Sequence, residues 1–210
     1  MKVLPISAIS ILLASFLHAG EPPANSTLAV NEAFDGAALG EAWHVNTGEW
    51  KVEDGVLKAR EIPEDKHSAA ARRSVMTGNA VYEFRFRLTG EGKGFHFGFD
   101  PAPGELDKKG HLFSVMVSPT DWKVMKHVDK AKPKEDPNEI LAQQKTEFVR
   151  GEWYSLRVTT WETHVTAAID GKETFKVSHP TFGVKKPTLV FRCLGDGMEV
   201  DDIKVWTANE

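Results

Sequence analysis

The sequence of 210 residues predicts an all-β fold in which two antiparallel sheets pack face to face. Apolar and polar residues alternate with a period of two in many short segments. Turns rich in glycine, proline and aspartate separate these segments, and no window has the 3.6-residue apolar period of a convincing amphipathic helix. Many short strands with turn signals between them are typical of a β-sandwich or a barrel.

The first residues have the features of an export signal. Met1 and Lys2 are followed by a mostly apolar run over residues 3–17 and by the small residues Ala19 and Gly20. This run is shorter than the roughly 20 residues that a membrane-spanning helix needs, and no later run approaches that length. We therefore expect a signal peptide over residues 1–19, a flexible leader over 20–30 and one domain over 31–208. This organisation predicts an exported protein, periplasmic or extracellular, with no membrane span.

The expected strands follow one another along the whole domain. Asp54-Gly55 lies between two short alternating runs, and Asp170-Gly171 lies between two more, so each pair is expected to form a hairpin. The strands in these hairpins cover residues 50–52, 56–58, 165–169 and 174–177, and further strands are expected at 81–88, 95–99, 112–117, 122–128, 153–161 and 203–206.

Composition excludes several classes of protein. The chain has 26 Lys and Arg against 30 Asp and Glu, a net charge of −4, which disfavours a nucleic-acid partner. Twelve Phe and six Trp supply enough apolar surface for a core. The single cysteine, Cys193, excludes a disulfide framework, and its alternating surroundings predict a buried thiol.

Five segments carry a resemblance to a known family. They are FDG at residues 34–36, GEWKVEDGVL at 48–57, GEWYSLRV at 151–158, AIDGK at 168–172 and VDDIKVW at 200–206. In this order they resemble the concanavalin A-like lectin/glucanase superfamily, and within it the exported 3-keto-disaccharide hydrolase-like domains. The resemblance implies a jelly-roll sandwich with a carbohydrate ligand in a groove on its concave sheet.

The sequence departs from this superfamily at two places. Laminarinase-type glucanases carry E-x-D-x-x-E or E-x-D-x-E on one strand, and Glu199-Val200-Asp201 matches only its first three positions. The hydrolase-like domains usually carry Asn-Ser-Gly after a long central strand, where this chain has residues 92–100. Glucanase chemistry of that type is therefore not expected.

Charged side chains on two expected strands are the candidates for catalysis. Glu83, Arg85 and Arg87 share one face of residues 81–88, where arginine can hold oxygens in a bidentate manner. His96 and Asp100 share one face of the next expected strand, and a histidine beside a carboxylate can act as an acid or a base. If the two strands pair in register, His96, Asp100 and Arg85 converge as a catalytic group beside the ligand-binding Glu83 and Arg87. The alternative is a solvated outer face with ordinary ion pairs.

Other side chains are candidates for ligand binding. Trp122 and Trp161 lie next to turns, where an indole can stack on a sugar ring or simply pack in the core. The loop over residues 63–67 carries Asp65 and His67, which either reach over a groove or belong to an ordinary polar loop.

A calcium site is also implied by the superfamily resemblance. Its relatives often hold a structural calcium between the N-terminal segment and the closing strand, and the matching residues here are Asp201 and Glu32. Hard oxygen ligands suit calcium, although six to eight of them are required.

Three functions remain open at this point. The first is an enzyme, a hydrolase or lyase that binds and cleaves an oxidised disaccharide. The second is a module that binds glycans without cleaving them, and the third is a cell-surface domain that binds another protein.

Overall fold

The computed structural model describes residues 24–209, in which all of the regular structure is antiparallel strand apart from two single 3-10 turns. The expected signal peptide lies outside these residues. The strands are β1 (Ser26–Glu32), β2 (Trp43–Thr47), β3 (Glu49–Glu53), β4 (Val56–Arg60), β5 (Ala69–Thr77), β6 (Ala80–Phe99), β7 (Phe113–Val117), β8 (Asp121–Lys126), β9 (Glu139–Lys145), β10 (Tyr154–Trp161), β11 (His164–Ile169), β12 (Lys172–Ser178) and β13 (Lys186–Ala208), and the turns are Pro63–Asp65 and Pro180–Gly183. The predicted all-β class is confirmed.

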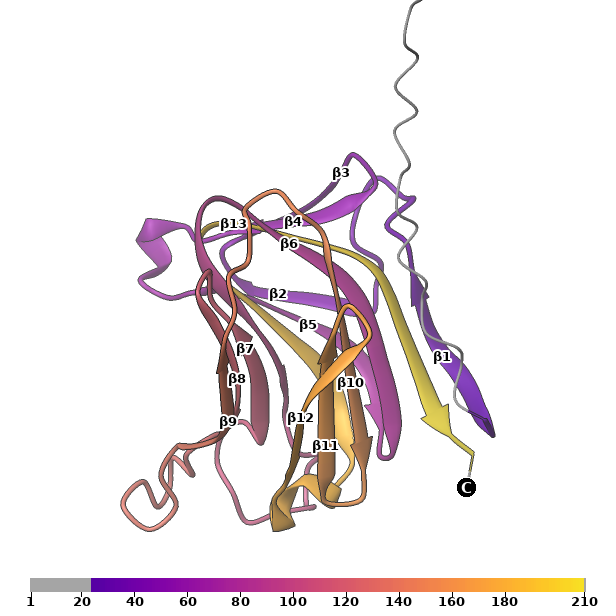
Figure 1. Cartoon of the computed structure of the whole chain (residues 1–210), viewed down its shortest axis with the longest axis vertical. Coiled ribbons are helices and arrows are strands. Elements are labelled where there is room, and N and C mark those ends of the chain that lie inside the picture. The colour runs from indigo at the N-terminus through magenta and orange to yellow at the C-terminus, as the bar shows by residue number, and fades with distance from the viewer. Residues whose placement is uncertain (1–23, 210) are drawn as a thin grey trace, which may run out of the picture.

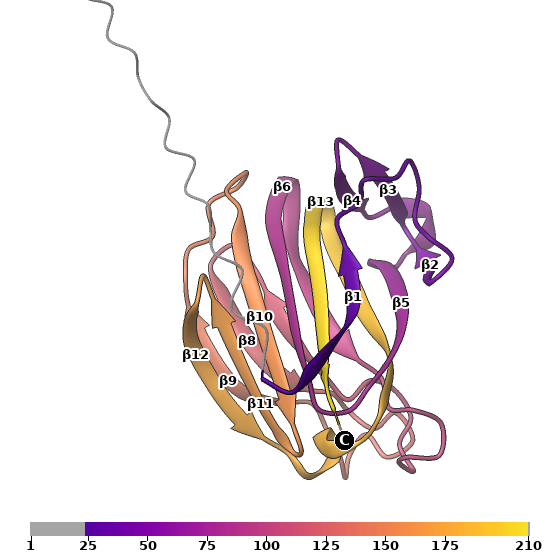
Figure 2. The ribbon, with the colours of Figure 1, turned by 90° about the vertical axis from the view of Figure 1, so that its right-hand side faces the viewer.

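Two long strands, β6 and β13, pair with each other along their lengths and contribute to both layers of a jelly-roll sandwich (Figure 1). We call layer A the strands β12-β11-β10, the first half of β6 and the second half of β13, with β1, β4 and β3 beyond them. Layer B consists of β9-β8-β7, the second half of β6 and the first half of β13, followed by β5 and β2. Figure 2 faces layer A, with β12, β11, β10, β6, β13 and β1 side by side.

Aromatic side chains that alternate along β6 fill the space between the layers. Phe84 of layer A packs edge-on against Phe97 of layer B, with ring centroids 4.9 Å apart. Trp122 of β8 packs against Phe175 of β12 with tilted rings, whose centroids are 4.1 Å apart. Each such ring contributes roughly 2–3 kcal/mol by its burial. The period-two pattern that predicts the strands therefore also builds the core.

Glycines allow β6 and β13 to change layers. A Cβ atom on Gly92 would lie within 3.0 Å of the Gly197 carbonyl oxygen, and Gly197 itself has φ +136°. The β6–β13 register shifts at the same place, between Leu194 and Gly195 and again between Asp196 and Met198. Such irregularities bend a strand, and here they occur where the backbones approach most closely.

Two parts of the expected organisation are wrong. The leader expected over residues 20–30 is the strand β1 from Ser26 onward, because Val30 is buried and β1 pairs with the end of β13. The two strands expected at residues 81–88 and 95–99 are one strand, β6, which runs through the glycines instead of turning. No helix in residues 24–209 is long and apolar enough to cross a membrane.

Candidate functional site

Polar side chains gather on the outer face of layer B. Along β6, Phe95, Phe97 and Phe99 point into the core, so His96 and Asp100 lie on the opposite, outer side. Between them Gly98 has no side chain, and a Cβ atom there would clash with Ser114 on β7. The β6–β13 register places Arg192 directly opposite His96.

Asp100, His111 and Arg192 form a chain of hydrogen bonds on this face. The Nδ1–H of His111 donates to Oδ1 of Asp100, and Arg192 Nη2 donates to His111 Nε2 at 2.6 Å. Since Nε2 accepts, this geometry fixes the proton of a neutral His111 on Nδ1. Arg72 Nε donates to the second oxygen of Asp100 at 3.3 Å. Asp100 thus orients His111 on one side while Arg192 contacts it on the other.

The electrostatics of the site keep Asp100 ionised. Burial raises the pKa of its carboxyl, but the hydrogen bond and charge of His111 and the charge of Arg72 outweigh burial, and the net pKa is lowered. Arg72 also donates to the side-chain oxygen of Asn46 on β2. Because Arg72 and Asp100 form an ion pair, each compensates the charge of the other.

Two further histidines stand beside His111 in their neutral forms. Burial, aided by the charges of His111 and His96, lowers the pKa of His127 to about 3. Burial, aided by the charges of Arg192 and Lys123, lowers the pKa of His96 to about 4. The His127 Nε2 atom lies 2.7 Å from the Ser114 hydroxyl, and the His111 and His127 rings meet edge to face at 5.4 Å. The three imidazoles line a cavity of about 10 Å³.

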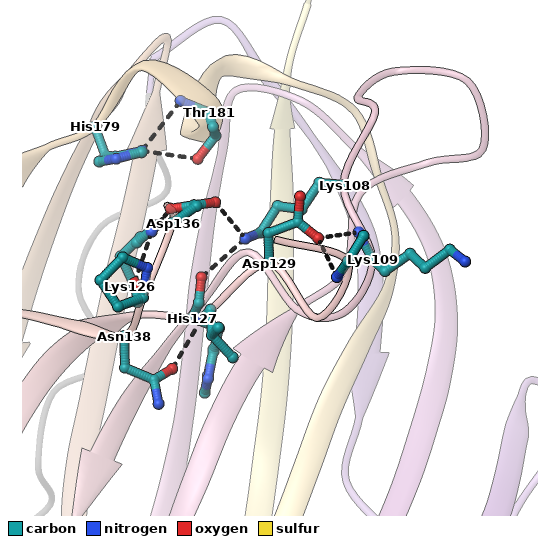
Figure 3. A network of polar contacts seen from close by, with 12 residues as sticks. Lys108, Lys109, Lys126, His127, Asp129, Asp136, Asn138, His179 and Thr181 are labelled. Carbon is teal, nitrogen blue, oxygen red and sulfur yellow. Dashed lines mark hydrogen bonds and ion pairs between the residues drawn. The ribbon is translucent and has the colours of Figure 1, made fainter. Parts of the chain in front are cut away.

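Hydrogen bonds between two loops fix the positions of His111 and His127. Asp129 accepts hydrogen bonds from the backbone N–H of Lys109 and of Ala131, at 3.0 and 2.8 Å. Lys108 Nζ donates to the His127 carbonyl oxygen at 2.9 Å and pairs with Asp136 at 3.1 Å (Figure 3). The loop before β7 and the loop after β8 are thereby held as one unit, from which the two histidines emerge.

Asp136 is the carboxylate on which this unit depends. It pairs with both Lys108 and Lys126, whose side chains are only 4% and 3% exposed. We predict that Asp136→Asn lowers the free energy of unfolding by about 2 kcal/mol in urea titrations, because it removes the carboxylate that pairs directly with two buried ammonium groups. Asp107→Asn is the control, since Asp107 is fully exposed in the neighbouring loop and its change should cost under about 0.5 kcal/mol. Equal losses in the two variants would contradict the prediction.

The charged row formed by Glu83, Arg85 and Arg87 lies on the other side of the molecule from this site. Arg85 pairs with Asp201 and Asp202, and Arg87 donates to Glu199 at 2.6 Å, all on the outer face of layer A. On the same face Glu83 accepts from Arg157 at 2.6 Å, and the guanidinium groups of Arg85 and Arg87 stack on Trp153 at 5.0 and 4.6 Å. The predicted convergence of His96 and Asp100 with Arg85 is therefore wrong, because β6 changes layers between them. In the structure the side chains of this row form ion pairs with neighbouring strands, as the alternative interpretation expected.

The two candidate tryptophans have opposite environments. Trp122 is 1% exposed in the core, so its prediction as an exposed platform is wrong: it alternates with outward-facing Lys123 along β8. Trp161 is 55% exposed at the end of β10, beside an apolar hollow of about 120 Å³ next to Trp206. Trp161 remains a candidate for stacking, but it lies on layer A, away from the histidines.

The structure also separates the remaining candidates from the histidines. Asp65 accepts a hydrogen bond at 2.6 Å from the backbone N–H of Gly48, which lies between β2 and β3, and His67 Nδ1 lies 2.8 Å from the carbonyl oxygen of the adjacent Ser68. Glu32 accepts from the Trp43 indole at 3.2 Å, while Asp201 is held by Arg85. The pair expected to bind calcium is thus engaged with different partners, and residues 24–209 contain no group of three side chains arranged to hold a metal.

His111, Ser114, His127 and Arg192 were not identified from the sequence. One signal was available for the histidines: His111 precedes one expected strand, and His127 ends the expected strand at residues 122–128. If these two strands form a hairpin, its open end brings the histidines together, as the bond of 2.8 Å from the His127 N–H to the Leu112 carbonyl oxygen shows. No comparable signal relates Arg192 to them.

Comparisons with known proteins add a family and a set of similar folds. A family described as "3-keto-alpha-glucoside-1,2-lyase-like domain" matches residues 30–205. A comparison with curated proteins gives no match.

Solved structures with a similar fold share little sequence with the chain. A non-specific endo-β-1,3(4)-glucanase of family GH16 is 14% identical with a TM-score of 0.69, over 91% of this chain and 95% of that one. The catalytic domain of a laminarinase from Thermotoga petrophila is 12% identical with a TM-score of 0.64, over 88% and 99%. The carbohydrate-binding module CBM66 from Bacillus subtilis is 14% identical with a TM-score of 0.59, over 77% and 93%. At these identities the likeness shows the fold alone.

Proposed function

Because the chain belongs to the 3-keto-alpha-glucoside-1,2-lyase-like domain family, we propose that it binds a glycoside on the outer face of layer B and cleaves it by elimination. The observation that carries the proposal is the hydrogen-bonded chain of Asp100, His111 and Arg192. In keeping with the apolar run at residues 3–17, we further propose that the protein acts after export.

Elimination from a 3-keto glycoside makes two demands on a protein. A base must take the proton from C2, whose acidity comes from the neighbouring C3 carbonyl, and a donor must stabilise the negative charge that develops on the carbonyl oxygen. The enolate electrons then form the C1–C2 double bond while the C1–O bond breaks, and the leaving oxygen takes up a proton. No change of oxidation state by an outside reagent is needed in this step.

His111 and Arg192 are placed to meet these demands together. In the substrate the C2 hydrogen and the C3 oxygen are on adjacent carbons, so the base and the cation must be neighbours. His111 Nε2 and Arg192 Nη2 are 2.6 Å apart. A ligand carbonyl that replaces Nε2 as the acceptor from Arg192 would free the lone pair of His111. Asp100 then stabilises the imidazolium that forms when His111 takes the proton.

Turnover of a defined substrate tests this proposal. The 3-keto form of 4-nitrophenyl α-glucoside should release nitrophenol when the full chain is added, and we predict that His111→Gln lowers kcat at least about 100-fold. His164→Gln is the matched control, because His164 is exposed on β11 of layer A and should retain full activity. Absence of turnover by the wild-type protein, or full activity of His111→Gln, would refute the elimination.

Binding without cleavage is the second candidate function. It is favoured by the contact of Arg192 with His111 Nε2, which leaves no free base in this structure, and by the small cavity beside it. In this case glycosides should bind with an affinity that His111→Gln changes by only a few fold, and no keto glycoside should be turned over. Measuring affinity and turnover on the same preparations separates the two functions.

A further inference from the structure

The outer face of layer B has an excess of positive charge, although the chain as a whole has a net charge of −4. The alternation along β8 and β9 and the register of β5, β6 and β13 define which side chains share this face. Four of them are positive and two are negative, which leaves an excess of two positive charges: Arg72, Lys123, Lys145 and Arg192 against Asp100 and Asp121.

Both carboxylates of this face are already engaged. Asp100 is held by His111 and Arg72. Asp121 accepts hydrogen bonds from the Ser118 hydroxyl and from Gln143 Nε2, each at 2.9 Å. Within residues 24–209, neither Lys123 nor Arg192 forms an ion pair with a carboxylate, and the side-chain bond of Arg192 goes to His111.

Two of the cations that form no ion pair among the described residues, Arg192 and Lys123, lie in one row across the sheet. Arg192, His96, Met116 and Lys123 occupy directly opposed positions on β13, β6, β7 and β8. Three strand spacings put the backbones of Arg192 and Lys123 about 14 Å apart, with His96 between them. The pKa of His96 is lowered first by burial, then by the positive charge of Arg192 and then by that of Lys123. Both cations therefore act electrostatically on the residue at the centre of the row.

From this row we infer that the ligand is an acidic saccharide whose carboxylate is recognised by Lys123. The inference rests on the proposed function, in which Arg192 faces the carbonyl oxygen of the reacting sugar. The enolate oxygen formed in that reaction carries only one negative charge, which Arg192 compensates. The reaction therefore provides no negative partner for Lys123. A uronic acid ring next to the reacting one, laid along the row, brings its carboxylate to Lys123. A neutral saccharide would cover this half-buried cation without compensating it.

Matched pairs of ligands test the charge requirement directly. The probes are disaccharide glycosides of 4-nitrophenol that carry a glucuronic, galacturonic or mannuronic acid unit, each compared with its neutral hexose counterpart by calorimetry on the full chain. In at least one pair the acidic member should bind about tenfold or more tightly, as expected for a charge-assisted contact. This advantage should shrink when the salt concentration is raised from about 0.05 M to about 0.5 M, because salt screens the attraction between the two charges.

Variants assign the effect to Lys123. Lys123→Gln should remove most of the tenfold advantage and leave the affinity for the neutral member within about twofold. Arg60→Gln is the matched control: it removes one positive charge from an exposed position on β4, which lies on layer A, and should change neither affinity. Equal binding of acidic and neutral members in every pair would overturn the acidic ligand while leaving the proposed function intact. Binding of neither member would overturn the acidic ligand, and turnover of the 3-keto form of 4-nitrophenyl α-glucoside decides the proposed function separately.

Discussion

Replacing Gly197 with alanine is expected to lower the free energy of unfolding by about 3–4 kcal/mol, and Tm by roughly 10 °C. The added methyl group would lie within 3.0 Å of the backbone carbonyl group of Thr89, which cannot rotate away as a flexible side chain would. Gly197 also has φ +136°, a conformation that side chains with a Cβ rarely adopt. Both effects act where β13 passes from one layer to the other, so the strain cannot relax without disturbing the sandwich.

Two other glycines separate the steric clash from the backbone conformation. Gly55 has φ +73° but open space around it, so Gly55→Ala should cost about 1 kcal/mol from conformation alone. Gly78 has neither a positive φ nor a neighbour within 4 Å, so Gly78→Ala should change stability by less than about 0.5 kcal/mol. Urea unfolding should rank the losses as Gly197, then Gly55, then Gly78. A Gly197→Ala protein as stable as Gly55→Ala would show that the crossover tolerates a side chain.

The same glycines explain where prediction of the fold from sequence stops. Alternation of residues such as Phe84 and Phe97 with polar neighbours reports a strand and its buried face, because burial of one face is what the period-two pattern records. The segment from Gly90 to Gly94 resembles a hairpin turn by composition. Glycine, however, serves equally for a turn and for a bulge that allows two backbones to approach. Local sequence does not distinguish these uses, since the partner at Gly197 is about a hundred positions away.

The candidate site divides in a similar way. His96 and Asp100 could be identified because they share a face of one strand, and both belong to the polar cluster. Arg192 contacts His111 across 81 positions of sequence, on a strand whose register nothing local specifies. Trp122 was predictable in principle: it alternates with Val124, so both point inward, yet the adjacent turn suggested an exposed ring.

Lys186, the first residue of β13, is a buried amine with no carboxylate at ion-pair distance among the described residues. It is 1% exposed, and its Nζ donates to the Val184 carbonyl oxygen at 2.8 Å. Burial lowers its pKa to about 8, against a weaker opposing effect of Glu105. An ammonium group in this position is disfavoured in the folded protein and not in the unfolded chain.

Stability should therefore rise with pH through the range in which the folded protein alone has lost this proton. Below pH 8 Lys186 is protonated in both states, whereas between about pH 8 and its ordinary pKa of 10.5 only the unfolded chain keeps the proton. Raising the pH then favours folding, by up to about 3 kcal/mol in total. We predict that the free energy of unfolding of the wild-type protein gains this amount relative to Lys186→Met between pH 7 and 10.5.

Comparison of the two proteins by urea unfolding at each pH isolates Lys186 from groups that titrate in both of them. Tyr82 is one such group, because burial raises the pKa of its phenol to about 12, and its contribution cancels in the difference. Lys185→Met, at the exposed neighbouring position, should follow the wild-type curve. A wild-type curve parallel to that of Lys186→Met would mean that the carbonyl oxygens around Nζ solvate the ammonium well enough to keep it charged, and that burial at this end of the sandwich does not exclude charge.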